Sequence, residues 1–341
     1  MTLRNLPALR SGARILFITN TRIGDVVLST GLLGLLSDTF PTARITVVAG
    51  PSACSLFAGA PGVERVIPLR KERYYRHWAR LYLGLLRPWD LIIDLRGSGL
   101  AWLLPTLRRR IVGRSDAAEP RVVELGRLLG AATPPAPRVW IQASDRQAAA
   151  RRVPTDSDFL AVAPGAGFPE KQWPPERFAA MIDRLTEPRA VGGSLAVTLL
   201  GAPEERPIVE AVCRRLADRR DTRRPIAVLG EPHLPVVAAI LERARLFIGN
   251  DSGLMHLAAA AGAPTVGLFG PTPPARYRPW GVPTLVIQSA NGRDEADPSG
   301  GFLPLRPMIE LDVERVVAGV SRFAAEIGLA TVAEETERMH G

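Results

Sequence analysis

The sequence predicts an α/β protein with two domains, each built around a mostly parallel β-sheet. Its 341 residues are too many for one ordinary hydrophobic core and suit two domains of about 150 residues each. Short β-branched runs alternate with helical patterns in both halves of the chain, which is typical of a parallel sheet covered by helices on both faces. A proline-rich break at 133–138 (TPPAPR) separates the two series, so we expect the domain boundary shortly after it.

Expected strands and helices alternate through the first half of the chain. The expected strands are Arg14–Thr19, Arg44–Ala49, Arg65–Pro68, Leu91–Asp94 and Ile111–Gly113. The expected helices are Asp25–Ser37, Ser52–Ala58, Tyr75–Arg87, Gly99–Leu107 and Val122–Leu129.

The alternation resumes in the second half after a short helical stretch. Its expected strands are Phe159–Ala163, Leu195–Leu200, Ile226–Leu229, Leu246–Gly249, Thr265–Phe269 and Thr284–Ile287. Its expected helices are Pro175–Leu185, Glu204–Ala217, Pro235–Arg243, Leu254–Ala261 and a final one at Asp312–Ile327. We therefore expect an N-terminal domain over residues 1–153 and a C-terminal domain over 154–310. A closing helix and polar tail over 311–341 could pack back on the N-terminal domain.

The composition is that of a globular protein, with 46% hydrophobic and 23% charged residues. Cys54 and Cys213 are too few for a disulfide framework and lack metal-ligand spacing, which favours a reduced compartment. No apolar run reaches the roughly 20 residues of a membrane-spanning helix. The N-terminus lacks the pattern of a signal peptide, so we expect a cytoplasmic protein.

The formal charge of +9 suits an anionic partner: nucleic acid, an anionic membrane surface or a phosphorylated substrate. No aromatic–basic RNA-binding signature, zinc finger or basic-region heptad is present. We therefore expect no nucleic acid partner.

The candidate functional residues follow strands, because ligands of parallel α/β sheets bind beyond the carboxyl ends of the strands. The first candidate segment, Asn20–Asp25 (NTRIGD), joins the first strand to its helix. Gly24 permits close approach of the backbone. Asp25 is suited to two compatible roles: capping that helix, or taking a proton from an attacking hydroxyl.

The second candidate segment is Phe159–Pro175 (FLAVAPGAGFPEKQWPP). Small residues around Gly165 let backbone N–H groups approach a phosphate, and Lys171 can add a positive charge just before a helix begins. The alternative is a tight loop with a solvated lysine.

The third candidate segment is Leu246–Pro271, where a strand ends and a helix rich in small residues follows a turn. Asp251 or Ser252 can cap that helix and leave the N–H groups of Gly253 and its neighbour aimed at a diphosphate. His256 lies on the helix and is suited to packing or to binding.

Together these segments resemble glycosyltransferase family 9, the ADP-heptose:lipopolysaccharide heptosyltransferases. The similar stretches occur in family order at 15–48, 91–115, 164–182 (PGAGFPEKQWPPERFAAMI) and 249–272 (GNDSGLMHLAAAAGAPTVGLFGPT). The resemblance implies a GT-B fold, in which two Rossmann-like domains face a central cleft. The acceptor belongs to the N-terminal domain and the nucleotide-sugar to the C-terminal domain.

The resemblance also implies roles for the candidate residues in an inverting transfer that needs no cofactor and no obligatory metal. Asp25 matches the proposed general base, and Lys171 matches the lysine that contacts the donor phosphates. The D-[ST]-G-x-x-H donor loop corresponds to Asp251, Ser252, Gly253 and His256, and Gly165 belongs to the donor side as well. Gly31 stands where the family commonly has proline.

The implied partners are ADP-heptose as donor and a lipid-linked lipopolysaccharide core glycan as acceptor. Basic and apolar residues mix in Arg70–Arg80, in the following LYLGLLRPW and in Arg108–Arg110. Such segments suit anionic lipid headgroups, at the inner face of the inner membrane, or equally an ordinary surface helix. Asp156 and Asp158 match a metal-binding Asp-x-Asp pattern of other sugar transferases, but they lie in the linker and we assign no metal to them.

Three other functions remain compatible with the sequence. The same chemistry could use a different nucleotide-sugar or glycan acceptor. The fold could serve a sugar-nucleotide epimerase or hydrolase. A nucleotide-binding protein without turnover is the non-enzymatic alternative, against which Asp25, Lys171 and Asp251 argue.

Overall fold

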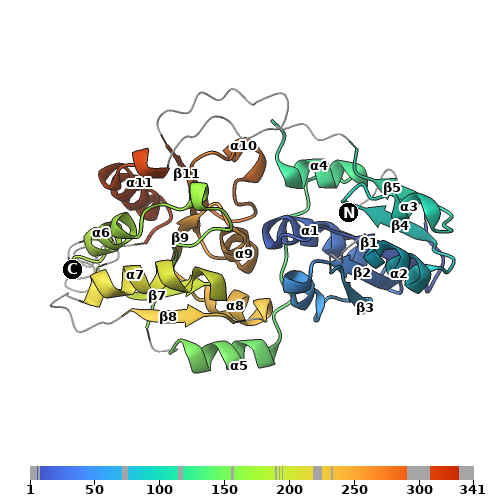
Figure 1. Cartoon of the computed structure of the whole chain (residues 1–341), viewed down its shortest axis with the longest axis horizontal. Helices are drawn as coiled ribbons and strands as arrows, with labels where there is room; N and C mark the ends of the chain where they lie inside the picture. Colours follow the sequence, from blue (N-terminus) through green and yellow to red (C-terminus); the bar gives the residue numbers. More distant parts are fainter. Residues whose placement is uncertain are drawn as a thin grey trace. The chain divides into compact units, whose positions relative to one another are not determined.

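The computed structural model describes residues 6, 8–70, 76–113, 118–154, 157–188, 190–191, 193, 195–217, 225–231, 233–289 and 308–329. The chain forms two compact units: residues 1–142 with 232–235, and residues 143–231 with 236–341 (Figure 1). Helix α5 (Ala143–Arg152) belongs to the second unit. The boundary of the units therefore lies just after the proline-rich break, earlier than the expected start of the second domain at residue 154.

The first unit is built on a five-stranded sheet with the order β3-β2-β1-β4-β5. Its strands are β1 (Arg14–Ile18), β2 (Arg44–Ala49), β3 (Val63–Pro68), β4 (Leu91–Asp94) and β5 (Arg109–Ile111). All neighbouring strands pair in parallel. The side chains of Ile15–Ile18 in β1 are fully buried, as expected for a central strand covered on both faces.

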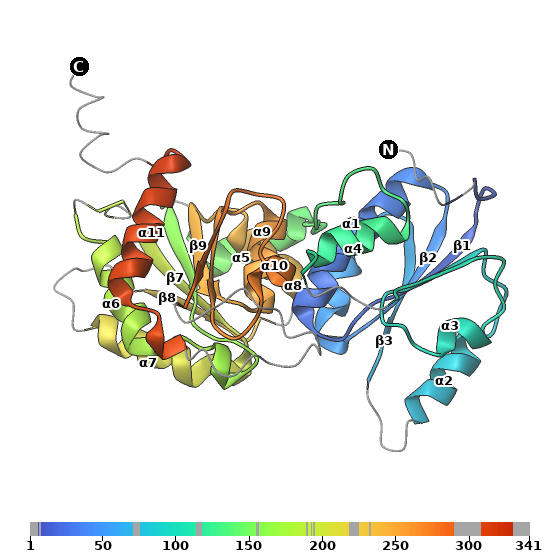
Figure 2. The same ribbon diagram turned by 90° about the horizontal axis from the view of Figure 1, so that it is seen from above.

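Helices cover the first sheet. They are α1 (Ile23–Thr39), the 3₁₀ helix η1 (Pro51–Phe57), α2 (Arg76–Leu85), α3 (Leu100–Leu103) and α4 (Arg121–Leu128). Helices α2 and α3 contact each other and lie side by side in Figure 2. They enclose a small apolar core with β4, in which Trp89 is fully buried.

The second unit is built on a six-stranded sheet with the order β11-β10-β9-β6-β7-β8. Its strands are β6 (Phe159–Ala163), β7 (Ala196–Gly201), β8 (Ile226–Leu229), β9 (Leu246–Asn250), β10 (Thr265–Phe269) and β11 (Thr284–Gln288). These strands are parallel as well. Its helices include α6 (Pro175–Leu185), α7 (Arg206–Ala217), α8 (Leu234–Leu241), α9 (Gly253–Ala261), α10 (Pro274–Tyr277) and α11 (Val313–Glu326).

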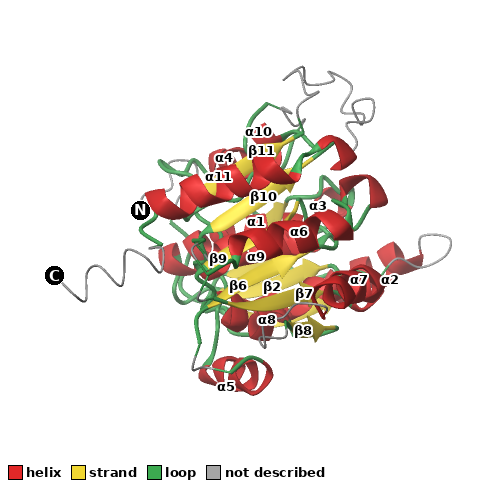
Figure 3. Cartoon of the chain, turned by 90° about the vertical axis from the view of Figure 1, so that its left-hand side faces the viewer, coloured by secondary structure: helices red, strands yellow, loops and turns green. Residues whose placement is uncertain are grey.

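Helix α11 packs on the second unit. It contacts β11 and lies beside α6 (Figure 3), and its buried residues Val316, Val320 and Phe323 join the core cluster of that unit. Helix α11 therefore contributes to the core of the second unit, and packing of the C-terminal segment on the N-terminal domain stays a prediction. The tail after Leu329 lies outside the described residues.

Strand β5 begins two residues before the expected segment Ile111–Gly113. Arg109 and Arg110 pair with Ile92 and Ile93 of β4. The apolar pattern did not predict this register, because an edge strand tolerates charged residues that a central strand excludes.

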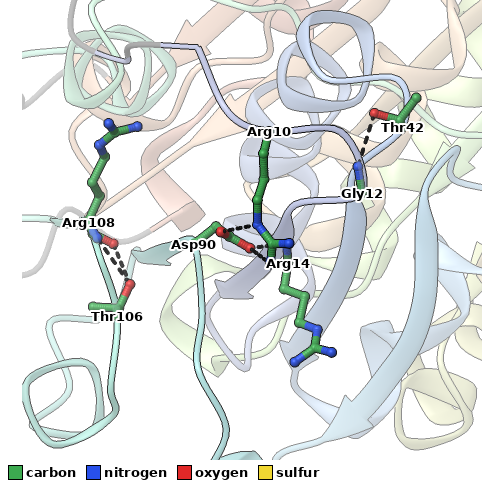
Figure 4. A network of polar contacts seen from close by, with 7 residues as sticks. All are labelled: Arg10, Gly12, Arg14, Thr42, Asp90, Thr106 and Arg108. Atoms are coloured by element: carbon green, nitrogen blue, oxygen red, sulfur yellow. Dashed lines mark hydrogen bonds and ion pairs between the residues drawn. The ribbon is translucent and has the colours of Figure 1, made fainter.

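The amino ends of β1 and β4 are joined by a network of polar contacts around Asp90 (Figure 4). Its carboxylate accepts hydrogen bonds from Arg10 Nε (2.8 Å), Arg10 Nη2 (3.1 Å) and the backbone N–H of Arg14 (2.8 Å). The hydrogen bond from Arg10, more than any other interaction, lowers the pKa of Asp90 below its ordinary value. This network lies at the amino edge of the sheet, and we assign it a structural role because ligands bind at the opposite edge.

Candidate functional site

The second sheet changes strand order at β6, whose neighbours are β9 and β7. The β6–β9 register pairs Ala163 with Gly249, so the loops that follow these two strands leave the sheet side by side. This is the topological switch point at which open α/β sheets bind ligands. The loops carry the two candidate segments of the second half of the chain.

Asn250, the last residue of β9, ties the two loops together. Its side chain is fully buried. Its Nδ2 donates to the carbonyl of Pro164 (2.8 Å), and its Oδ1 accepts from the backbone N–H of Trp173 (3.2 Å). Sequence reasoning assigned no role to this residue, although a polar side chain at the end of a buried strand is a signal for one.

Lys171 and Asp251 meet at this switch point. Lys171 Nζ lies 2.6 Å from Asp251 Oδ2, with the two side chains 17% and 7% exposed. The alternative of a solvated lysine is therefore wrong. Asp251 does not cap the following helix, because Ser252 occupies the N-cap position of α9. The lysine ammonium is held at the carboxyl edge of the sheet, where a phosphate could accept its remaining hydrogen bonds.

The first turn of α9 begins at Gly253. The N-cap residue Ser252 makes no capping hydrogen bond, and its hydroxyl is buried without a hydrogen-bond partner in the described part of the chain. The first N–H groups of any helix lack intrahelical acceptors and carry partial positive charge. His256 is buried in the same turn, with its Nε2 4.0 Å from Asp251 Oδ1.

Gly165 and Glu205 form a second contact at this edge. A Cβ added to Gly165 would lie 2.2 Å from Cδ of Glu205, so only glycine leaves room for this carboxylate. Glu205 Oε2 accepts a hydrogen bond from the backbone N–H of Ala202 (2.8 Å). Burial raises the pKa of Glu205 above its ordinary value. The sequence reasoning missed Glu205, because its position after β7 becomes informative only when the strand order is known.

Asp25 lies in the first unit, after the central strand β1. Helix α1 begins at Ile23, so Asp25 is in its first turn and the N-cap residue is Arg22. The capping role weighed for Asp25 is therefore wrong. No hydrogen bond or ion pair of its half-buried carboxylate is found within the described part of the chain. The chain adds β2 and β3 on one side of β1 and then β4 and β5 on the other side, so Asp25 also follows a switch point.

The loops that follow β6 and β9 of the second sheet can hold an anion. The first turn of α1, which follows β1 of the first sheet, presents the carboxylate of Asp25. Within the described ranges, no three His, Cys, Asp or Glu side chains are grouped to hold a metal ion. Asp156 of the Asp-x-Asp pattern lies outside those ranges. None of the helices that the structure describes is long and apolar enough to cross a membrane.

Two units, each built on a parallel sheet covered by helices, are the architecture of the GT-B class of fold. The chain belongs to glycosyltransferase family 9: the model described as "Glycosyltransferase family 9 (heptosyltransferase)" matches residues 118–297. It is therefore a glycosyltransferase, and the family resemblance seen in the sequence is confirmed.

Individual relatives agree with this assignment. The lipooligosaccharide heptosyltransferase 2 of Haemophilus ducreyi is 26% identical over 317 residues, covering 82% of this chain and 89% of the relative. The solved family 9 glycosyltransferase of Veillonella parvula matches with a TM-score of 0.76 at 22% identity, covering 94% of this chain and 99% of that chain. An E. coli heptosyltransferase solved with ADP matches with a TM-score of 0.66 at 18% identity, covering 91% and 99%. The two structural matches confirm the GT-B fold.

Proposed function

We propose that this enzyme transfers a heptose from ADP-heptose to a lipopolysaccharide core acceptor, with inversion at the anomeric carbon and without a metal. The family and the relatives named above support heptose and ADP. The observation that carries the proposal is the meeting of Lys171, Asp251 and the amino end of α9 at one switch point. This is the arrangement expected for a site that binds a diphosphate.

The second unit binds the donor in this proposal. The Lys171 ammonium and the free N–H groups around Gly253 bind the diphosphate, and the unpartnered Ser252 hydroxyl donates to it. His256 borders the same anion, and Gly165 brings the backbone close to the nucleotide. The carboxylate of Glu205, beside Gly165, accepts hydrogen bonds from ribose hydroxyls. All of these groups lie at the carboxyl edge of one sheet.

Asp25 serves as the general base. Its carboxylate takes the proton of the acceptor hydroxyl while that oxygen forms a bond to the anomeric carbon. The bond from that carbon to the diphosphate breaks, and ADP leaves with the electron pair. Attack from the face opposite the leaving group inverts the configuration. Lys171 and the α9 N–H groups offset the charge that builds on the leaving oxygen.

The acceptor in this proposal is lipid-linked, which places the enzyme at the cytoplasmic face of the inner membrane as a peripheral protein. The excess of positive charge, +9 for the chain, favours the phosphorylated core and the anionic headgroups around it.

A thermal-shift panel of ADP, UDP, GDP and ADP-heptose tests the donor assignment. A ligand at 100 times its dissociation constant adds about 2.7 kcal/mol to the free energy of unfolding, so ADP and ADP-heptose should raise Tm clearly and UDP much less. Lys171→Ala should weaken ADP-heptose binding about tenfold or more, because a hydrogen bond to a charged group is worth about 1.5–3 kcal/mol.

The matched control is the same substitution at Lys71, since the chain has only these two lysines. Lys71→Ala should keep the full shift. A preference for UDP, or an unchanged shift in Lys171→Ala, would overturn the donor assignment. The anomeric configuration of the glycosidic product, determined by NMR, tests inversion. Turnover measured in excess EDTA tests the absence of a metal requirement.

A further inference from the structure

The segment containing α2 and α3 presents large apolar side chains to solvent. Five of the six large apolar residues that are mostly exposed in the described part of the chain belong to residues 83–107, with 53–80% of their surface accessible. They are Leu83, Leu86, Trp102, Leu103 and Leu107. We call these five residues the α2–α3 surface. Such clustering is unusual, because the exposed apolar residues of soluble proteins are normally scattered.

The elements beneath this surface are well packed, so its exposure is not a sign of a missing core. Leu81 and Leu85 of α2 are buried against Trp89, and Leu100 and Leu104 are buried beneath α3. A surface helix normally turns polar residues outward once its apolar face is covered. Leu83 lies on α2 between the buried Leu81 and Leu85 yet points to solvent. The same holds for Trp102 and Leu103, which follow the buried Leu100 and Ala101.

The charged residues of the same segment are almost all positive. Residues 76–113 contain seven arginines and two acidic residues, Asp90 and Asp94, and both carboxylates are buried. Arg109 lies over the ring of Trp102, with its Cζ 5.1 Å from the ring centroid. Arginine next to exposed tryptophan and leucine is the composition that inserts into the headgroup boundary of an anionic bilayer.

We propose that the α2–α3 surface docks on an anionic lipid bilayer, with its leucines and Trp102 inserted among the acyl chains and its arginines at the headgroups. A second copy of this chain is a poorer occupant, since a symmetric contact would bring the same arginines face to face. This inference deepens the proposed function by locating the surface that meets a lipid-linked acceptor, and it rests on that function for its biological sense. Residues 71–75 of the basic segment Arg70–Arg80 lie outside the described residues.

Vesicle co-sedimentation of the full chain, without donor or acceptor, tests the proposal. Vesicles of phosphatidylglycerol and phosphatidylcholine should bind the protein, and pure phosphatidylcholine vesicles should bind it much less. Raising the salt concentration should weaken binding, because headgroup attraction is screened. Leu103→Glu combined with Leu107→Glu should weaken binding to the mixed vesicles by at least about tenfold, which is 1.4 kcal/mol.

The matched control is Ile309→Glu, because Ile309 is the one mostly exposed large apolar residue outside this surface among those that the structure describes (59% accessible). Ile309→Glu should bind vesicles as the unmodified chain does, and all variants should keep the same Tm. Three results would overturn the proposal: no binding to anionic vesicles, equal loss in Ile309→Glu, or a dimer in sedimentation that the Leu103/Leu107 variant abolishes. If the protein does not bind anionic vesicles while ADP-heptose still raises its Tm, the docking surface alone would be rejected. Vesicle binding without any ADP-heptose shift would reject the proposed function instead.

Discussion

Glu205 shows how the surroundings of a single residue decide what its side chain can do. Its carboxylate rests against Gly165 and accepts one backbone hydrogen bond, from Ala202, so other lone pairs of its oxygens remain to accept from a ligand. Burial raises its pKa. Asp251 is buried more fully than Glu205, and it has the ammonium of Lys171 beside it. The two carboxylates at this edge therefore differ in whether a fixed cation accompanies them.

With Glu205 at the ribose, as we propose, its raised pKa predicts that ADP-heptose binding depends on pH. The ionised carboxylate accepts two hydrogen bonds from a ribose diol, whereas the protonated form loses acceptor capacity. Affinity should therefore be full above the raised pKa and should fall as the pH drops through it. Glu205→Gln should bind about tenfold or more weakly near neutral pH, as expected for a hydrogen bond to a charged group, and its affinity should change less with pH.

Isothermal titration of the unmodified enzyme and the Glu205→Gln variant across the acid range measures this difference. ADP-heptose is the suitable ligand, because free ADP has a terminal phosphate that itself titrates near pH 6. A constant ratio between the affinities of the two proteins at every pH would contradict the assignment of Glu205 to the donor.

At the scale of elements, the sequence predicted most strands to within a residue or two. β2, β4, β6, β8 and β10 have the expected bounds, because each is a short β-branched or apolar run. All of them except the edge strand β8 are almost entirely buried. The predicted strand Ile111–Gly113 was misplaced, since β5 takes its register from pairing with β4 rather than from its own apolar pattern. The sequence showed Gly31 only as a departure from the family pattern. Its close approach to the segment at 135–136 becomes evident only in the structure.

Gly31 of α1 is required by a close approach of the proline-rich segment. A Cβ at this position would lie 2.3 Å from the carbonyl oxygen of Pro135 and 2.4 Å from that of Ala136. Backbone atoms cannot move aside cheaply, so Gly31→Ala should lower the free energy of unfolding by about 1–3 kcal/mol, as overpacking does. Urea or thermal unfolding of the variant measures the change.

Gly34→Ala in the same helix is the control. The nearest atoms to its Cβ, at 3.0 Å and beyond, belong to the flexible side chain of Arg138. Alanine is favoured over glycine inside a helix by about 1 kcal/mol, so this variant should be neutral or more stable. Equal destabilisation by both substitutions would show that the contact with the 135–136 carbonyls is not the cause.

At the scale of the whole molecule, both units have the same change of strand order beside a central strand. In each sheet the first strand of the series is central, and the chain adds strands first on one side of it and then on the other: β1 lies between β2 and β4, and β6 lies between β7 and β9. The sequence predicted the two series of elements and the residues after these strands. It could not show that Asn250 would bridge the two loops or that Glu205 would lie beside Gly165, because both contacts join segments that are far apart in the chain.

The division between the units predicts that donor binding and turnover can be separated. Asp25 belongs to the first unit, and the residues that we propose to bind the donor belong to the second. Asp25→Asn keeps the shape of the side chain but cannot accept a proton, so kcat should fall about 10²- to 10⁴-fold, the usual contribution of a general base. In Asp25→Asn, the thermal shift with ADP-heptose should stay as in the unmodified enzyme, because the side chain lies outside the proposed donor site. Lys171→Ala should weaken the donor shift and turnover together, because in the proposed site its ammonium contacts the diphosphate both in the bound donor and in the transition state. If Asp25→Asn kept near-normal turnover while folded, Asp25 would not be the general base. If the variant lost both turnover and the ADP-heptose shift, the Asp25 carboxylate would act in donor binding rather than in proton transfer.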